Sequence, residues 1–194
     1  MMISTPRPLR ADAERSVHAI LEAAERTLSA DPGASMEQIA AATGVARTTI
    51  HRRFVNRQAL LDALALSAAE RLIQAIGDGR PDTAPPLVAL HRITANVLDV
   101  KGAWAFALSI PAPAGSAAAQ LHDDIAQHCL TVLERARGTG LIAADTDLQW
   151  TRRVYYALLA ATLQTPEEDA GLDVDALAAR IIDTLLHGAA RRAT

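Results

Sequence analysis

Apolar residues recur along most of this chain at the three- and four-residue spacing that one face of an α-helix requires. The first such stripe lies within residues 11–29, before the helix-breaking Asp31-Pro32-Gly33, and consists of Val17, Ile20, Leu21, Ala24 and Leu28. No long alternation of polar and apolar residues, the mark of a half-buried strand, occurs in the sequence. Half of the residues are apolar, and the helix formers Ala and Leu dominate them. The pattern predicts an all-α protein.

Breaks that contain glycine or proline divide the chain into about nine helices. After the first helix, the expected ranges are 35–44, a short stretch from residue 46, and then 56–76, 87–100, 104–110, 116–137, 145–164 and 174–188. The first ten residues, with Pro6 and Pro8, are expected to form a mobile arm. We divide the chain into an N-terminal three-helix domain, residues 1–60, and a C-terminal helical domain, residues 61–194.

Two short helices joined by a tight corner are predicted between residues 35 and 54. Ser35 can cap the first of them by accepting a hydrogen bond from the backbone N–H of Glu37 or Gln38. Gly44 can end it, because glycine adopts the left-handed conformation at little cost. The buried face of this helix is expected to contain Met36, Ile39 and Ala40.

The second helix of this pair begins near Ala46, after Val45, which is expected to fill the corner as an apolar plug. Ile50 and Phe54 are four residues apart and therefore face inward together. The outward face then carries Arg47, Thr48, His51 and Arg52. Asn56 follows as the expected cap of the next helix, and Asp145 or Asp147 has the same role for the helix that ends near residue 164.

Positive charge is concentrated around this helix pair. Residues 38–61 contain four Arg and no Asp or Glu, although the whole chain has a formal net charge of -3. Residues 1–60 have a net charge of +2, and residues 61–194 have a net charge of -5. A basic segment in an acidic protein is typical of a surface that binds phosphates, because neutralised phosphates release their counterions.

This segment resembles the N-terminal DNA-binding domain of TetR-type transcriptional regulators. The resemblance rests on Ile39-Ala40, Gly44-Val45-Ala46, Thr49-Ile50, Phe54 and the helix start Asn56-Arg57-Gln58-Ala59-Leu60. It covers about the first quarter of the chain closely, and the remainder through the order of its helices. His51 and Arg57 depart from the family, which usually has Tyr and Lys at these two positions.

The resemblance implies a helix-turn-helix regulator, a repressor, that binds a palindromic operator in double-stranded DNA as a homodimer. The expected base-facing residues are Arg47, Thr48 and His51, and the expected phosphate contacts are Thr49, Arg53 and Arg57. Arg52 suits either role, because an Arg fork can bond guanine O6 and N7 together. Ser35 completes the predicted DNA-contacting set, and Arg7 and Arg10 of the arm are candidates for backbone contacts.

The family also encloses a pocket for a small-molecule inducer between its fourth and eighth helices, and binding there releases the DNA. In this chain an aromatic pair lies in a short helix between glycine and proline. The expected lining residues are Leu64, Leu90, Thr94, Trp104, Phe106, Leu121, Ile125, Tyr156 and Gln164. The set carries little charge, so an apolar or weakly polar ligand is expected. For each residue the alternative is a place in the ordinary core.

The last two helices carry more apolar surface than a single neighbour can cover. A monomer that exposed it would have an apolar patch larger than the few hundred Å² typical of soluble monomers. We therefore expect a two-fold, four-helix dimer interface. Its predicted residues are Tyr155, Leu159, Leu163, Leu177, Ile181 and Leu185.

Composition argues against other classes of protein. Cys129 is the single cysteine, which excludes an internal disulfide and suits a reducing compartment. No apolar run approaches the roughly 20 residues that a membrane-spanning helix needs, and the N-terminus lacks the apolar region of a signal peptide. A cytoplasmic protein without a membrane segment is expected.

Metal, cofactor and enzyme functions find little support in the sequence. The pairs His18–Glu22 and Asp124–His128 have the spacing of two ligands on one helix face, but nothing nearby completes four ligands, so ion pairs are expected. Phosphate-binding glycine loops and nucleophile motifs do not occur. Two rival functions stay open: a helical adaptor that docks an acidic protein partner, and an enzyme on a helical bundle.

Overall fold

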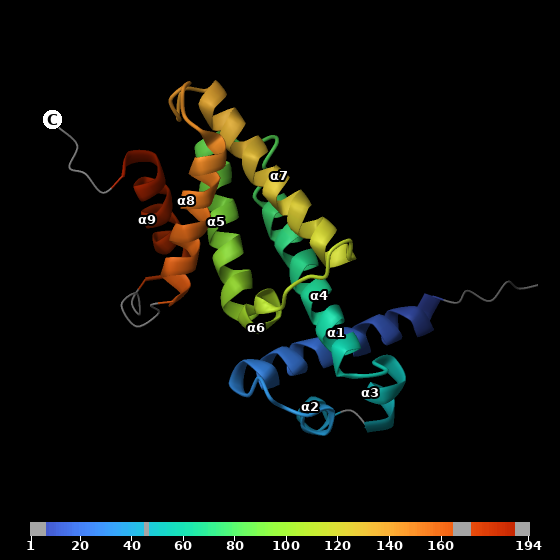
Figure 1. Cartoon of the computed structure of the whole chain (residues 1–194). Helices are drawn as coiled ribbons and strands as arrows, with labels where there is room; N and C mark the ends of the chain where they lie inside the picture. Colours follow the sequence, from blue (N-terminus) through green and yellow to red (C-terminus); the bar gives the residue numbers. More distant parts are fainter. Residues whose placement is uncertain (1–6, 45–46, 165–171, 189–194) are drawn as a thin grey trace, which may run out of the picture. The chain divides into compact units, whose positions relative to one another are not determined.

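The computed structural model describes residues 7–44, 47–164 and 172–188, and for residues 7–16 and Arg47 it describes the backbone alone (Figure 1). Within these ranges all regular secondary structure is helical, which confirms the prediction of an all-α protein. The helices are α1 Arg7–Ala30, α2 Met36–Thr43, α3 Arg47–Arg53, α4 Arg57–Asp78, α5 Pro86–Ala103, α6 Ala105–Ser109, α7 Ala117–Gly138, α8 Leu148–Gln164 and α9 Val174–His187. None of the helices in the described ranges is both long and apolar enough to cross a membrane.

The chain forms two compact units. Unit 1 consists of Met1–Ala68 and Trp104–Ala112, and unit 2 consists of Ala69–Ala103 and Pro113–Thr194. This division differs from the predicted one at residue 60, because the first part of α4 belongs to unit 1. It also adds to unit 1 a second stretch, Trp104–Ala112, which contains α6 and which we call the return segment.

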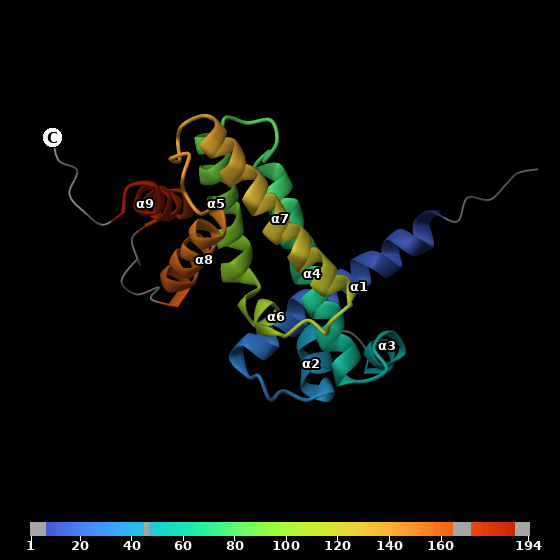
Figure 2. The ribbon, with the colours of Figure 1, turned by 45° about the horizontal axis from the view of Figure 1, so that its top comes forward.

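Unit 1 has a single core made by α1, α2, α3, the start of α4 and the return segment. Ile20, Ile39, Ile50 and Leu64 are completely buried in it, as the helical periodicity predicts. The short helix α2 packs against both α1 and α3 (Figure 2). Both helices of the predicted pair are therefore anchored in this core.

The first helix begins earlier than predicted. Residues 7–10 are the first turn of α1, so the prediction of a mobile arm over residues 1–10 is wrong for them. Pro8 is compatible with this, because the N–H groups of a first helical turn have no partners within the helix. Residues 1–6 and the side chains of Arg7 and Arg10 lie outside the part that the structure describes, and so does their predicted contact with DNA.

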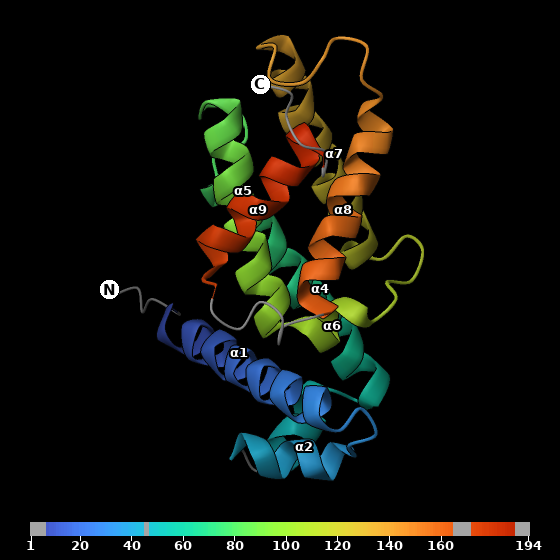
Figure 3. The ribbon, with the colours of Figure 1, turned by 90° about the vertical axis from the view of Figure 1, so that its left-hand side faces the viewer.

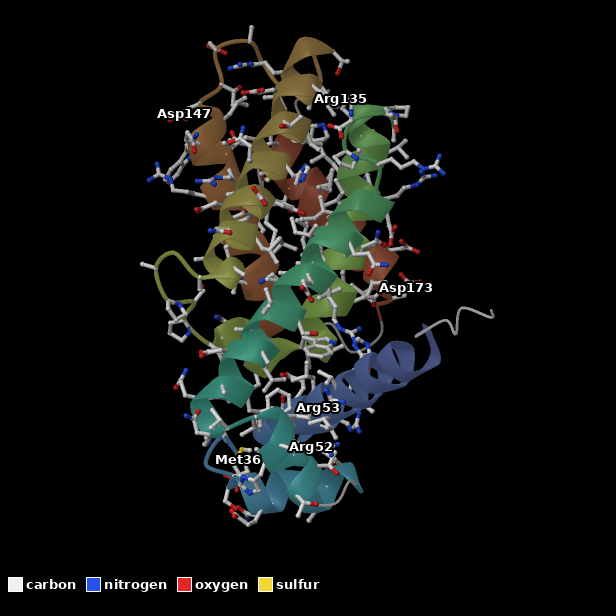
Figure 4. The ribbon with its side chains drawn as sticks, turned by 90° about the vertical axis from the view of Figure 1, so that its right-hand side faces the viewer. Met36, Arg52, Arg53, Arg135, Asp147 and Asp173 are labelled. Carbon is white, nitrogen blue, oxygen red and sulfur yellow. The ribbon has the colours of Figure 1, made fainter. Side chains whose placement is uncertain are left out.

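In unit 2, helix α5 is the central element and packs against α7, α8 and α9 (Figure 3). Gly79 lies directly against the side chain of Ile93, and a Cβ at this glycine would overlap it. Arg135, near the end of α7 (Figure 4), donates hydrogen bonds to the carbonyls of Pro81 and Ala84 in the loop between α4 and α5. These contacts fix the loop that leads into α5.

Candidate nucleic-acid interface and effector region

A reciprocal cap starts α2. The Ser35 hydroxyl accepts a hydrogen bond from the Gln38 N–H at 3.2 Å, and the Gln38 side-chain oxygen accepts from the Ser35 N–H at 2.7 Å. This arrangement satisfies two N–H groups at the helix start that have no partner within the helix. Gly44 ends α2 at a φ of +66°, as predicted. Ser35 is therefore occupied by capping, and its DNA contact stays a prediction.

Helix α3 presents a polar face to solvent. Ile50 is completely buried and Phe54, just after the helix, is 6% exposed, as predicted. The side chains of Thr48, His51, Arg52 and Arg53 are exposed, and Thr49 is half-buried (Figure 4 labels Arg52 and Arg53). The structure thus gathers most of the predicted DNA-contacting side chains on one short helix. The side chain of Arg47, and Val45 and Ala46 in the corner, lie outside the described residues.

One contact across the corner was not anticipated from the sequence. The Nε2 atom of His51 on α3 lies 3.9 Å from a carboxylate oxygen of Glu37 on α2, and both side chains are well exposed. Glu37 is the last acidic residue before the acid-free stretch, so it borders the basic face directly. The family usually has Tyr at the position of His51, and here the imidazole pairs with an acid on the neighbouring helix.

The Arg57 side chain, for which the resemblance implies a phosphate contact, is bonded to backbone carbonyls of its own chain. Its Nη2 donates to the Pro32 carbonyl at 2.7 Å, and its Nε lies 3.4 Å from the Ala34 carbonyl. These bonds tie the start of α4 to the loop between α1 and α2. Asn56 caps α4 as predicted, since its side-chain oxygen accepts from the Ala59 N–H at 2.8 Å.

The predicted inducer-lining residues divide between the two units. Leu64 and Trp104 lie in the core of unit 1, and Phe106 packs against that core. Both aromatic residues therefore contact the core around α1, and their contact with a ligand stays a prediction. The other six candidates belong to unit 2, and they are Leu90, Thr94, Leu121, Ile125, Tyr156 and Gln164.

A buried pair of hydroxyl groups joins α5 to α8 in unit 2. The Thr94 hydroxyl donates to the Leu90 carbonyl at 2.6 Å and lies 2.9 Å from the Tyr155 hydroxyl. Both side chains are almost completely buried. Burial raises the pKa of Tyr155 far above its ordinary value, so the phenol stays protonated and keeps its hydrogen bond.

Helices α7 and α8 share a second polar contact. Cys129 on α7 and Tyr156 on α8 influence each other's pKa, and the Arg152 guanidinium lies 5.8 Å from the centre of the Tyr156 ring. Burial raises the pKa of the Cys129 thiol to about 11, and the nearby Arg152 only partly offsets this. The Nε of Arg152 is buried and has no hydrogen-bond partner among the described residues.

The remaining predicted ligand-lining residues of unit 2 differ in exposure. Leu121 and Ile125 are half-buried on α7, and Gln164 is exposed at the end of α8.

Half of the predicted dimer-interface set lies inside a single chain. Tyr155, Leu159 and Ile181 are 3–4% exposed, which leaves almost no surface for a second copy. Within the chain, α5 packs against α9 and contacts α8 as well, so their assignment to the interface stays a prediction. Leu163, Leu177 and Leu185 are half-buried and keep some surface.

The exposed face of α8 is different from the predicted one. Trp150 is 58% exposed, and the Arg153 guanidinium lies 5.0 Å from the centre of its ring. Further along the helix, this face carries the exposed small residues Ala157, Ala160 and Ala161. The sequence gives little signal for this face, because most of its side chains are alanine and not large apolar residues at helical spacing.

The described residues contain no group of three or more His, Cys, Asp or Glu side chains that could hold a metal ion. His18 and Glu22 lie 3.5 Å apart in the ion-pair geometry that their spacing predicts.

Two short packed helices, α2 and the basic α3, followed by a larger helical unit, are the architecture of a helix-turn-helix DNA-binding regulator. Residues 20–64 match the family model for bacterial regulatory proteins of the TetR family. The HTH-type transcriptional repressor LfrR of Mycolicibacterium smegmatis is 32% identical to this chain over 156 residues, which are 80% of this chain and 81% of LfrR. The chain belongs to the TetR family of transcriptional regulators, and the resemblance of the helix pair is confirmed.

Solved structures support the same family. The crystal structure of the TetR-like regulator LfrR from Mycobacterium smegmatis, in complex with proflavine, has 30% identity and a TM-score of 0.73, over 93% of this chain and 99% of that one. The TetR family regulator PfmR from Thermus thermophilus has a TM-score of 0.76 at 19% identity, over 89% of this chain and 99% of that one, and shares the fold. These relatives favour a regulator over the adaptor alternative.

Proposed function

We propose that this protein is a repressor that binds a palindromic operator as a homodimer through α3, and that leaves the operator when unit 2 binds a small molecule. The main support for DNA binding is the outward face of α3. A fully buried inner side, with Ile50 at its centre, fixes the helix, while Thr48, His51 and Arg52 are left for base edges. An α-helix fits the major groove, where each base pair presents a distinct pattern of donors and acceptors.

Specific binding to a duplex is the direct test of this proposal. Fragments from the region around the gene are titrated in gel-shift assays against random duplex of equal length at moderate salt. We expect a preference of about 10³-fold or more for one palindromic fragment, the lower end of the range for specific regulators. A protein that prefers no fragment over random duplex has another function, and binding to an acidic protein instead would restore the adaptor alternative.

For the effector, we propose a site in unit 2 among α5, α7 and α8. The half-buried Leu121 and Ile125 supply apolar surface, and Tyr156 with Arg152 supplies polar groups. The relative LfrR was crystallised with proflavine, so an aromatic molecule of that kind is the first ligand to test. Proflavine fluorescence titrated with the protein measures binding, and gel-shift assays with and without it measure release of the operator.

For the dimer, we propose that α8 and α9 form the two-fold interface through the exposed face of α8. Trp and Arg are enriched in protein interfaces, and Trp150 and Arg153 lie together on this face. Ala157, Ala160 and Ala161 would let a second α8 approach closely, since their side chains are small. The half-buried Leu163, Leu177 and Leu185 would contribute at the edge of the same interface.

A further inference from the structure

Glu25 is a charged residue in the core of unit 1. It lies on the buried face of α1, between Ala24 and Leu28, and is only 3% exposed. Burial of a carboxylate is costly unless hydrogen-bond donors replace the lost water. The structure supplies two such donors from residues that follow Glu25 by 81 and 82 positions in the sequence.

Three donors meet the Glu25 carboxylate. Its Oε1 accepts from the Phe106 N–H at 2.9 Å and from the Ser29 hydroxyl at 3.0 Å, and its Oε2 accepts from the Ala107 N–H at 2.9 Å. The two amides belong to the first turn of α6, where N–H groups have no partners within the helix. Trp104 stands at the N-cap, a position usually held by Ser, Thr, Asp or Asn. Glu25 therefore caps α6 from another helix.

The return segment that Glu25 holds is joined to unit 2 at both ends. It follows Ala103 at the end of α5 and leads through Pro113 to α7. Trp104 and Ala107 attach it to the core of unit 1 by apolar packing. Apolar packing has little direction, whereas two hydrogen bonds to one carboxylate fix the rotation and position of the helix end.

We infer that Glu25 is the positioning residue that makes α6 a rigid part of unit 1, so that the ends of α5 and α7 set the orientation of the DNA-binding helices. The inference rests on the proposed function as a dimeric, ligand-responsive repressor. A ligand that moves either end of the return segment then moves α1 through this carboxylate. Without the Glu25 carboxylate, α6 can shift relative to α1, so the same movement is not transmitted to α1. The two α3 helices of a dimer are then less precisely spaced.

Glu25→Gln tests this at nearly constant volume. The amide oxygen can accept from one of the two α6 N–H groups, but the amide nitrogen faces the other as a second donor. Glu22→Gln is the matched control, because it makes the same change of charge on the same helix, at a half-buried position near His18. Both are made in the full-length chain.

The first measurement is hydrogen exchange at the amides of Phe106 and Ala107. We expect exchange about tenfold faster or more in Glu25→Gln than in the wild type and Glu22→Gln, with the Ile50 amide unchanged as proof that unit 1 is folded. Unchanged exchange at both α6 amides overturns the inference. If Ile50 loses its protection, Glu25→Asp keeps the charge but withdraws the carboxylate by one methylene, and unchanged exchange at both α6 amides in that variant also overturns the inference.

The second measurement is discrimination of operator spacing. The selected operator is compared with duplexes in which one base pair is added or removed between the half-sites. We expect Glu25→Gln to lose about threefold or more of the wild-type preference for the native spacing, while a merely destabilised unit 1 would weaken all duplexes alike. Release of the operator by proflavine should weaken in the same variant, with proflavine affinity unchanged.

The outcomes separate the two proposals. Wild-type protein that prefers no duplex contradicts the proposed function, and hydrogen exchange still decides whether Glu25 holds α6. Wild-type protein that discriminates spacing, together with a Glu25→Gln variant that discriminates equally well, contradicts the inference alone.

Discussion

The hydroxyl groups of Thr94 on α5 and Tyr155 on α8 lie 2.9 Å apart in the interior of unit 2. Thr94 also donates to the Leu90 carbonyl, so Tyr155 is the donor in the pair. The two residues therefore depend on each other unequally. Thr94 keeps one hydrogen bond if Tyr155 is removed, whereas the Tyr155 hydroxyl loses its acceptor if Thr94 is removed.

This asymmetry predicts unequal costs for two conservative substitutions. Thr94→Val leaves the buried Tyr155 hydroxyl without an acceptor and should lower the free energy of unfolding by about 1–3 kcal/mol. Tyr155→Phe removes the donor and should cost about 0.5–1.5 kcal/mol. The double variant should be more stable than the sum of the two costs implies, because no buried hydroxyl is then unpaired. Urea unfolding of all four proteins checks this, and additive costs would contradict the pairing.

The free energy of unfolding should decrease as the pH rises above about 9. Burial raises the pKa of Cys129 from 9.0 to about 11 and that of Tyr156 from 10.0 to about 12. Burial also raises the pKa of Tyr155. Each group keeps its proton to a higher pH in the folded chain than in the unfolded chain. The unfolded chain therefore loses protons first as the pH rises, and it is favoured increasingly from about pH 9 to pH 12.

Urea midpoints measured between pH 7 and pH 11 test the contribution of the thiol. We expect a flat region up to about pH 8.5, then a continuous decline. Cys129→Ala should decline less than the wild type between pH 9 and pH 11, because it lacks the titrating group. Parallel curves for the two proteins would mean that Cys129 ionises equally easily in the folded and unfolded chains.

Sequence reasoning succeeded where structure is decided locally. The caps at Ser35, Asn56 and Asp147 depend on residues within three positions of the helix start, and each is present in the structure. Gly44 likewise needs only its own backbone freedom. Helix ends and the inward face of the helix pair could therefore be predicted from short segments.

Long-range partners could not be predicted in the same way. A helical stripe shows that Tyr155 and Ile181 are buried, but it does not show whether another helix of this chain or a second copy covers them. Trp104 was placed with unit 2 because its neighbours in sequence belong there, although its neighbours in space are on α1. The sequence does carry one signal for Glu25, since a carboxylate within the apolar stripe of α1 needs a buried partner.

Arg52 should contribute to sequence-specific DNA binding. Arg52→Ala removes an exposed guanidinium from α3 and should weaken binding to the selected operator by roughly 1–3 kcal/mol, with relaxed preference at one base position. Arg92→Ala is the matched control, because it removes an exposed Arg from unit 2. Gel-shift titrations with single-base operator variants give both values. Equal losses in the two variants would indicate a general effect of charge.

Arg57 should stabilise the position of α2 and α3, because it bonds the start of α4 to the loop between α1 and α2. Arg57→Ala breaks the bonds to the Pro32 and Ala34 carbonyls and should lower the thermal stability of unit 1 and the affinity for all duplexes. We expect the dependence of affinity on salt to stay unchanged in this variant. A slope that flattens by about one unit would instead show the phosphate contact that the family resemblance implies.

The dimer should fail when charge is placed on the exposed face of α8. Ala157 and Ala160 are both exposed, so arginine at these positions can be accommodated in a single folded chain but not between two closely packed α8 helices. Ile181 is a poorer choice for this test, because it is buried and a charge there would unfold unit 2. Gln127→Arg, at an exposed position on α7, is the control for added charge.

Light scattering should show a monomer for the Ala157→Arg and Ala160→Arg double variant and a dimer for the control, with equal helix content by circular dichroism. Operator binding should fall towards the non-specific level, because two half-sites about 34–36 Å apart can be engaged together only by a dimer. The Trp150 ring should also become more accessible to a fluorescence quencher in the monomer than in the dimer, since it lies on the same face. A double variant that remains a dimer and binds the operator normally would place the interface on another surface.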